Sequence, residues 1–173
     1  MTADRCAESG PRVVFITRRF WPLFGGAETV IGNLAAALAS RGLRPTIVTA
    51  CWEQHWPQEI VHRSVQVVRL PQPPHRMFGT WWYMKELAIW LRRHRAEFDL
   101  VYVSQLKHDA YVAVRVGRRL GFPVILRATG AGETGDCHWQ ATGRCGGRIR
   151  RVTRRAHVII APSPAIEAEL LAA

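Results

Sequence analysis

The fold of this chain is decided by residues 13–50, whose sequence is VVFITRRFWPLFGGAETVIGNLAAALASRGLRPTIVTA. The segment opens with a β-branched and aromatic run, Val13 to Thr17, which is typical of a buried strand. After a loop with two glycines, apolar residues recur at helical spacing from Ala27 to Ser40. Gly42 then stands where helices commonly end in a left-handed cap, and Thr46 to Ala50 predicts a second strand. A strand, a helix and a strand in this order predict a parallel α/β unit.

The same alternation continues along the rest of the chain. We expect further strands at 65–70, 100–104, 124–128 and 157–161, and helices at 81–95, 110–120 and from Pro164 onward. Strands that alternate with helices form a parallel sheet covered on both faces. We therefore predict the α/β fold class, with a single doubly wound, Rossmann-like parallel sheet in three α/β/α layers. Residues 12–173 should form one domain, and residues 1–11 a disordered N-terminal tail.

The net charge of +11 at pH 7 comes almost entirely from arginine, because Lys85 and Lys107 are the only lysines. Such a surface attracts nucleic acids, acidic membranes or phosphorylated ligands. No apolar stretch approaches the roughly 20 residues that cross a bilayer, and the polar start lacks the apolar core of a secretory signal. We expect a cytoplasmic protein, and the excess of arginine over lysine favours a GC-rich bacterial source.

The four cysteines, Cys6, Cys51, Cys137 and Cys145, are unevenly spread. Without an export signal they are expected to be free thiols. Cys137, His138 and Cys145 lack the close pairing and the fourth ligand of a structural zinc site, so we expect no metal.

Ligands of doubly wound sheets bind at the carboxyl ends of the strands, near the point where the strand order reverses. This rule singles out the loops at 18–26, 104–109 and 129–137. In the first loop, Gly25 and Gly26 open a helix whose bare N–H groups and dipole favour an anion. A plain turn that needs glycine for its dihedral angles is the alternative, and both remain open at this point.

The other candidate residues of these loops are polar, charged or glycine. Lys107 and His108 follow the fourth strand, where polar groups suit a polyol or a phosphate. The alternative for His108 is a helix-cap residue without chemistry, and both remain open. Glu133 and Asp136 are able to accept hydrogen bonds from sugar hydroxyls. Loop position adds three further substrate-binding candidates, which are Arg18, Arg127 and Gly130.

A G-x-G-x-x-G pattern occurs at Gly130, Gly132 and Gly135, after the fifth expected strand. Dinucleotide sites need a helix directly after this pattern, and residues 136–147 show no helical period. We predict a flexible active-site loop here, or an irregular surface loop, in place of a dinucleotide site. A Walker phosphate loop is excluded because no G-K-[S/T] occurs.

The segment 76–95 is aromatic with basic ends. Tryptophan and tyrosine near arginine are typical of a membrane interface with anionic head groups. Its apolar residues also form an ordinary core stripe, made by Met77, Trp81, Met84, Leu87, Ala88 and Leu91. A core helix and a peripheral membrane contact are compatible, so both remain open.

Several of these segments resemble a known pattern. Pro22-x-x-Gly25-Gly26-Ala27-Glu28 after the first strand is similar to the N-terminal domain of family 4 glycosyltransferases of the GT-B fold. The resemblance continues through Thr46–Thr49, Asp99–Tyr102, Pro123–Arg127 and Ala156–Ser163, in family order, and spans roughly Arg12 to the end.

The resemblance implies a retaining glycosyltransferase of hexosyltransferase type in carbohydrate biosynthesis. Such enzymes transfer a sugar from a nucleotide-diphosphate sugar to a glycan or lipid-linked acceptor, without an obligatory metal or other cofactor. The match carries Gly25 and Gly26 to the donor diphosphate, whereas Arg18, His108 and Glu133 are placed by loop position alone, the last two as catalytic candidates.

The family also has a second, nucleotide-binding domain with an E-x7-E pair, and the printed sequence has no counterpart of it: Glu167 and Glu169 are too close together. We therefore expect an incomplete transferase that is inactive alone and is completed by a C-terminal donor domain in cis or in trans. Half of the electrostatic stabilisation of the leaving diphosphate would otherwise be missing.

Two rival functions follow from the charge and the fold. A nucleic-acid-binding module should gather its basic residues on one recognition element, and here the arginines are scattered over several helix ends, so we expect no nucleic-acid partner. A free-standing Rossmann domain that binds sugar phosphates or nucleotides is the second alternative.

Overall fold

The computed structural model describes residues 10–173, so nine residues of the predicted N-terminal tail lie outside the described part. The strands are β1 Arg12–Ile16, β2 Arg44–Cys51, β3 Glu59–His62, β4 Val65–Pro71, β5 Leu100–Ser104, β6 Val124–Arg127 and β7 Val158–Ile160. The α-helices are α1 Gly26–Ala39, α2 Arg76–Arg93, α3 His108–Leu120, α4 Asp136–Thr142, α5 Gly146–Thr153 and α6 Pro164–Ala172. Two short 3-10 turns are η1 Arg95–Glu97 and η2 Gly132–Thr134.

All of these strands belong to one seven-stranded sheet in the order β3-β4-β2-β1-β5-β6-β7. Six of them are parallel, as predicted, with Phe15 paired to Ile47 on one side and to Tyr102 on the other. The exception is β3, which pairs antiparallel with β4 at the sheet edge and was missed by the sequence analysis. Its sequence, Glu-Ile-Val-His, is too short, and its side chains are too exposed, to give a strand pattern by itself.

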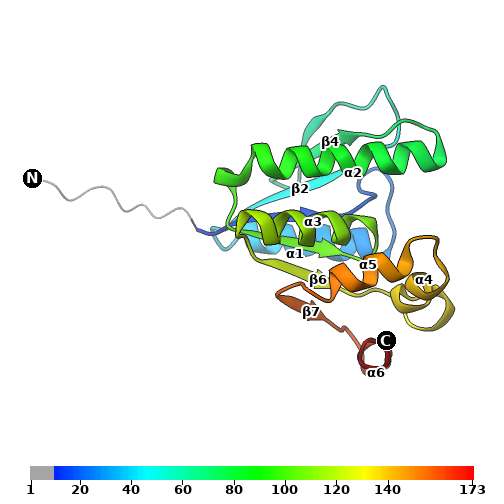
Figure 1. Ribbon diagram of the computed structural model, residues 1–173. Coiled ribbons are helices and arrows are strands. Elements are labelled where there is room, and N and C mark those ends of the chain that lie inside the picture. Colours follow the sequence, from blue (N-terminus) through cyan, green and yellow to red (C-terminus); the bar gives the residue numbers. More distant parts are fainter. Residues whose placement is uncertain (1–9) are drawn as a thin grey trace, which may run out of the picture.

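Helices cover both faces of the sheet (Figure 1), which confirms the predicted α/β class and the Rossmann-like three-layer arrangement. On one face, Ile31 and Ala35 of α1 pack on Phe15 and Ile47. On the other face, α2 and α3 form the larger core, in which Tyr83, Leu87 and Leu91 of α2 are fully buried. Burying a side chain of this size stabilises the fold by roughly 1.5–3 kcal/mol, so the two cores hold the sheet rigid beneath the loops.

The core stripe predicted for α2 is wrong at its first turn. Met77 is 68% exposed and Trp81 58% exposed, whereas Tyr83 is fully buried. The helix starts at Arg76, five residues before the predicted start, and its fully buried residues Tyr83, Leu87 and Leu91 belong to one core. The stripe that faces the sheet is rotated accordingly.

The loop predicted after β6 is also more regular than expected. Residues 136–147 contain α4 and the start of α5, joined by a short turn. Gly130 and Gly132 have φ angles of 69° and 64°, in the left-handed region that favours glycine. The glycines thus fold the chain back so that Asp136 can open α4, which the local sequence alone did not indicate.

Candidate functional site

The sheet order reverses between β1 and β5, since the chain runs outward from β1 through β2 and β4 and then returns to β5 and β6. At such a switch point, the loops that follow the two central strands diverge and leave a crevice at the carboxyl edge. The loop after β1 carries Arg18 and leads to Gly25, and the loop after β5 carries Lys107 and leads to His108, the first residue of α3. The structure therefore brings the first and second predicted loops to one place.

Arg18 is held in a fixed position at this edge. Its Nε donates to Gln72 Oε1 at 2.7 Å and its Nη2 donates to Thr80 Oγ1 at 3.1 Å. The guanidinium also lies 4.6 Å from the centre of the Tyr83 ring, and Trp52 Nε1 donates to the Arg18 carbonyl at 3.0 Å. The result is an ordered positive charge, which no carboxylate among the described residues neutralises by an ion pair.

Gly25 and Gly26 begin α1, Gly25 as the N-cap with a φ of −141°. Neither glycine has a positive φ, so the turn does not need glycine for its dihedral angles. A Cβ at Gly25 would lie 2.6 Å from Glu28 Oε2, whereas a Cβ at Gly26 would meet nothing within 4 Å. Gly25 thus makes room for the Glu28 carboxylate, and Gly26 leaves backbone open at the positive end of the helix dipole, which suits an anionic ligand.

His108 is the first residue of α3 and stacks edge-on against Trp139, with 5.1 Å between the ring centres. Burial lowers its pKa, and the positive charges of Arg18 and Lys107 lower it further. The imidazole is therefore neutral at pH 7 and has a nitrogen free to accept a proton or a hydrogen bond.

Lys107 lies with its Nζ 3.8 Å from Asp136 Oδ1 and 5.7 Å from the centre of the Trp139 ring. Its charge is thus partly engaged within the protein. Arg127 ends β6 beside Ser104, and its charge lowers the pKa of Tyr102, which burial raises. Because Tyr102 belongs to the core under α1, Arg127 lies on that face of the sheet.

Gly130 and Glu133 lie on the outer turn after β6, and both are exposed. No hydrogen bond or ion pair within the described residues joins Glu133 to Arg18, Lys107 or His108. Asp136, expected to face a sugar, is instead buried and engaged by the protein itself. Its Oδ2 accepts from Leu106 N at 3.0 Å, from Thr129 N at 2.9 Å and from Thr129 Oγ1 at 3.2 Å.

Sequence reasoning missed two further residues of the site region. Asp109, next to His108, is 6% exposed, and burial raises its pKa from 3.8 to about 6 against the opposing charges of Arg18 and Lys107. Arg69 of β4 is buried and donates to the carbonyls of Trp21 and Pro57 at 2.9 and 2.8 Å, which holds the loop that precedes Gly25. A lone arginine within the apolar run Val-Gln-Val-Val-Arg-Leu was the available signal for the second residue.

Residues 10–173 contain no group of three or more histidine, cysteine, aspartate or glutamate residues that could hold a metal ion. Cys51, Cys137 and Cys145 are free thiols. None of the described helices is both long enough and apolar enough to cross a bilayer.

Solved structures of several proteins share this fold. Sucrose-phosphate synthase from Thermosynechococcus elongatus superposes with a TM-score of 0.72 at 15% identity, over 94% of this chain and 45% of that chain. Anabaena HepE in complex with UDP gives 0.61 at 18% identity, over 93% and 40%. A putative UDP-N-acetylglucosamine 2-epimerase from Listeria monocytogenes gives 0.63 at 14% identity, over 94% and 42%.

At these identities the likeness shows the fold, that of the Rossmann-like N-terminal domain of GT-B proteins, and this chain spans less than half of each relative's length. No curated protein sequence matches the chain. The family model described as Glycosyltransferase Family 4 matches residues 24–173, from the glycine loop through the last strand and helix. Since this match covers most of the chain, the protein belongs to glycosyltransferase family 4.

Proposed function

We propose that this chain is the acceptor-side half of a retaining hexosyltransferase, which moves a sugar from a nucleotide-diphosphate sugar to a glycan or lipid-linked acceptor. The observation that carries the proposal is the match to glycosyltransferase family 4 over residues 24–173. The carboxyl edge of the sheet at the switch point supports it, because Arg18, Gly26 and His108 supply a cation, an open helix N-terminus and a neutral imidazole there.

Each of these groups has a distinct task in the proposal. The N–H groups at the start of α1 approach the donor diphosphate, and Gly26 rather than Gly25 provides the open backbone. Arg18 offsets negative charge on the acceptor or the leaving group, and His108 accepts a hydrogen bond from an acceptor hydroxyl. Gly130 and Glu133 contribute to the acceptor side from the third loop, and Lys107 and Arg127 add positive potential.

The proposal includes a second, nucleotide-binding half, supplied in cis or in trans. The relatives with the same fold are more than twice as long as the part that matches this chain. We propose that the chain alone does not transfer sugar, that the reaction needs no metal or other cofactor, and that the protein is cytoplasmic, with peripheral membrane contact at the inner face of the plasma membrane.

A transfer assay tests the proposal directly. The chain is incubated with UDP-, GDP- and ADP-hexoses and a lipid extract, alone and together with the C-terminal donor domain of a family 4 transferase. We expect product only in the combined reaction, with the anomeric configuration of the donor retained by NMR. Transfer by the chain alone, or an inverted product, would contradict the proposal.

Calorimetry separates this function from the alternative of a free-standing nucleotide-binding domain. The acceptor-side half should bind sugar nucleotides only weakly, because it offers the diphosphate one helix terminus and the proposal assigns the nucleoside to the second half. Micromolar binding of UDP-glucose or GDP-mannose by the isolated chain favours the alternative.

A further inference from the structure

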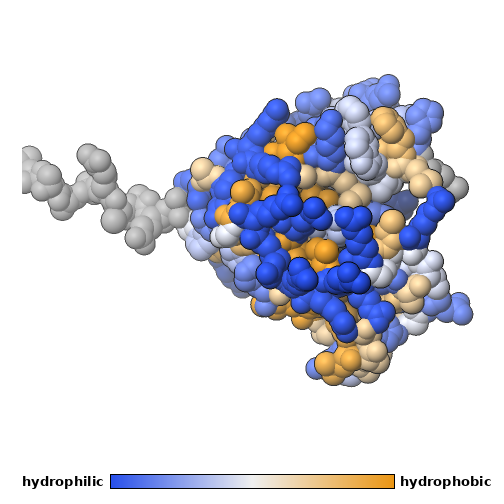
Figure 2. All heavy atoms as spheres, in the orientation of Figure 1, coloured by the Kyte–Doolittle hydropathy of each residue, from blue (hydrophilic) through white to orange (hydrophobic). Residues whose placement is uncertain are grey.

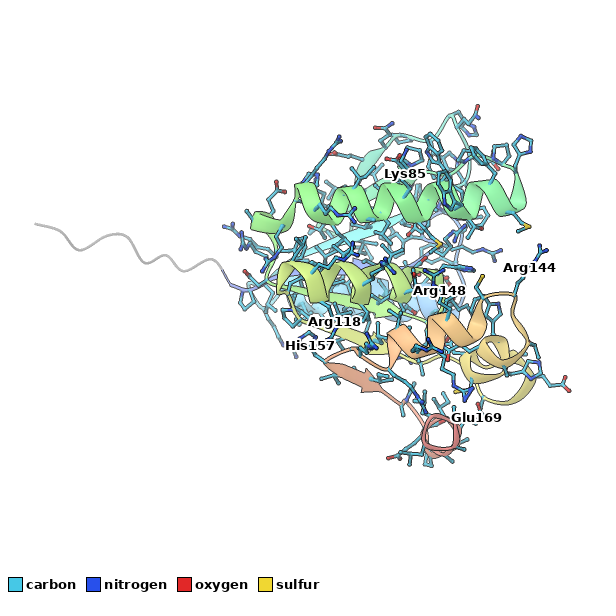
Figure 3. The ribbon with its side chains drawn as sticks, viewed as in Figure 1. Lys85, Arg118, Arg144, Arg148, His157 and Glu169 are labelled. Carbon is cyan, nitrogen blue, oxygen red and sulfur yellow. The ribbon has the colours of Figure 1, made fainter. Side chains whose placement is uncertain are left out.

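The exposed charged residues of the outer layer formed by α2, α3 and α5 are all basic. The central helix, α3, packs against both of its neighbours, and hydrophilic side chains gather over all three helices on the face shown in Figure 2. Figure 3 labels one basic residue from each helix on this side: Lys85, Arg118 and Arg148. The basic face consists of Lys85, Arg92, Arg115, Arg118, Arg119, Arg148 and Arg151, all of them exposed.

No acidic side chain of α2, α3 or α5 offsets this charge. The three helices contain two acids, of which Asp109 is buried and Glu86 lines a cavity between α2 and the sheet. The three ion pairs found within residues 10–173 involve none of the basic-face residues. Side chains of one sign without counter-charges produce a strong local potential, which favours an anionic partner.

Tyr111 joins the basic residues of α3 to those of α5. Arg115 Nη1 donates to Tyr111 Oη at 3.1 Å, and the Arg148 guanidinium lies 5.8 Å from the centre of the Tyr111 ring. On α3, Arg115, Arg118 and Arg119 lie opposite the buried residues and point to solvent. The basic face is therefore one continuous surface across two helices and the flank of a third.

An aromatic corner adjoins the basic face in the first two turns of α2. It consists of Met77, Phe78 and Trp81, which are 68%, 50% and 58% exposed. Phe78 stacks on Trp81 with 6.2 Å between ring centres, and Lys85 Nζ lies 4.7 Å from the centre of the Trp82 ring. Arg144, from the turn before α5, donates to Met77 Sδ at 3.4 Å and so places another cation beside the corner.

The corner and the basic residues of α2 share one stripe of the helix. Phe78, Trp81, Lys85 and Arg92 are separated by three, four and seven residues, and at 3.6 residues per turn they all lie on one side. The opposite side holds the fully buried Tyr83, Leu87 and Leu91. The exposed stripe is therefore apolar at the end near the carboxyl edge of the sheet and basic at the other end.

We propose that the basic face and the aromatic corner dock onto an anionic phospholipid bilayer. Arginine and lysine meet anionic head groups, and tryptophan, phenylalanine and methionine enter the interfacial region, where such side chains are favoured. A single-stranded nucleic acid fits less well, because its sites interleave exposed aromatic and basic residues along a groove, whereas the exposed aromatic residues of these three helices, Phe78 and Trp81, are confined to one corner.

Docking in this way has a consequence for the proposed function. The aromatic corner lies at the start of α2, at the carboxyl edge of the sheet. In the same part of this helix, Thr80 Oγ1 accepts a hydrogen bond from Arg18 Nη2. The candidate site then lies next to the lipid head groups, as a lipid-linked acceptor requires. This consequence rests on the proposed function. The docking specifies the surface for the membrane contact that this function includes, and its test needs no sugar nucleotide, so the docking can fail while the transfer function stands.

Vesicle flotation tests the docking with the 173-residue chain. Vesicles of phosphatidylcholine with 30% phosphatidylglycerol, by mole, should carry the chain at about 0.1 M salt, and pure phosphatidylcholine vesicles should not. Binding should fall steeply at about 0.5 M salt, because exposed charges are then screened. Absence of flotation with the anionic vesicles at the lower salt concentration would overturn the proposal.

Matched variants locate the surface. Neutralising a basic residue near an anionic bilayer weakens binding about fivefold, so R118Q/R119Q should weaken it about 25-fold. R41Q/R44Q removes the same charge from exposed positions at the end of α1 and the start of β2, away from this face, and should change binding less than threefold. Equal losses in the two double variants would show attraction by net charge alone and would overturn the assignment.

Two further measurements are informative. The first distinguishes the contribution of the aromatic corner to binding from that of the charge, and the second distinguishes a bilayer from a nucleic acid as the partner. W81S should weaken vesicle binding with the salt dependence unchanged, and it should reduce the quenching of tryptophan fluorescence by brominated lipid. Circular dichroism checks that each variant is folded. A single-stranded RNA that displaces the chain from vesicles at nanomolar concentration would assign the face to nucleic acid and overturn the proposal.

Discussion

Asp136 connects two of the three loops of the candidate site, and its removal should show this in the free energy of unfolding. The buried carboxylate accepts three hydrogen bonds, from the backbone N–H of Leu106 and from both donors of Thr129. A hydrogen bond to a charged group contributes roughly 1.5–3 kcal/mol, and its loss leaves buried donors unsatisfied. Burial raises the pKa of Asp136, so part of this gain is offset by the desolvation of its charge.

We therefore expect D136A to lower the free energy of unfolding by about 3–5 kcal/mol, and D136N by about 1–2 kcal/mol because an amide oxygen can still accept. Urea denaturation followed by circular dichroism measures both values. E133A is the matched control, because Glu133 is exposed in the same loop region, and it should change stability by less than about 0.5 kcal/mol.

Amide hydrogen exchange supplies the second measurement. In D136A the N–H groups of Leu106 and Thr129 should exchange at least tenfold faster relative to those in the strand interiors. A D136A effect below about 1 kcal/mol, or unchanged protection at both amides, would refute the inference that this carboxylate holds the loops together.

Three further predictions follow from single positions. Burial raises the pKa of Asp109 from 3.8 to about 6, so protonation of this carboxyl favours the folded form. The stability that Asp109 contributes is fully present below pH 3.8 and is lost as the pH rises through 6. D109N should therefore be roughly 3 kcal/mol more stable than the native chain at pH 7 and equally stable at pH 3.5, which thermal melts at both pH values can show. In G26A the added Cβ has no atom within 4 Å, so urea denaturation should show a variant as stable as the native chain or about 0.4–1 kcal/mol more stable. Sugar transfer by the combined halves should fall at least tenfold. Unchanged transfer would show that Gly26 is not part of the diphosphate site. G146A places a Cβ against the Gln140 carbonyl and should destabilise the fold by about 2–4 kcal/mol, whereas G147A, with open space around its Cβ, should leave the melting temperature unchanged within about 2 °C; similar effects of the two would contradict the close packing of α4 on α5.

The sequence alone determined the elements whose signal is local. The apolar run at Val13–Thr17, the period of 3.6 from Ala27 to Ser40 and the strand that follows were read correctly, because each pattern lies within one element. The alternation of such elements then specified a parallel sheet and the carboxyl edge at which ligands bind. The glycine loop could be located in the same way, since loop position follows from strand order.

Only the tertiary structure decided the features that depend on contacts between distant segments. The strand β3 exists because β4 offers it hydrogen-bonding partners, and its own four residues carry no pattern. Arg18 is ordered by Gln72 and Thr80, which lie 54 and 62 residues away, and Asp136 joins loops 30 residues apart. The exposure of Trp81 was also decided by the tertiary structure. A period of 3.6 predicts the width of an apolar stripe, but it does not predict which residues of the stripe reach the sheet.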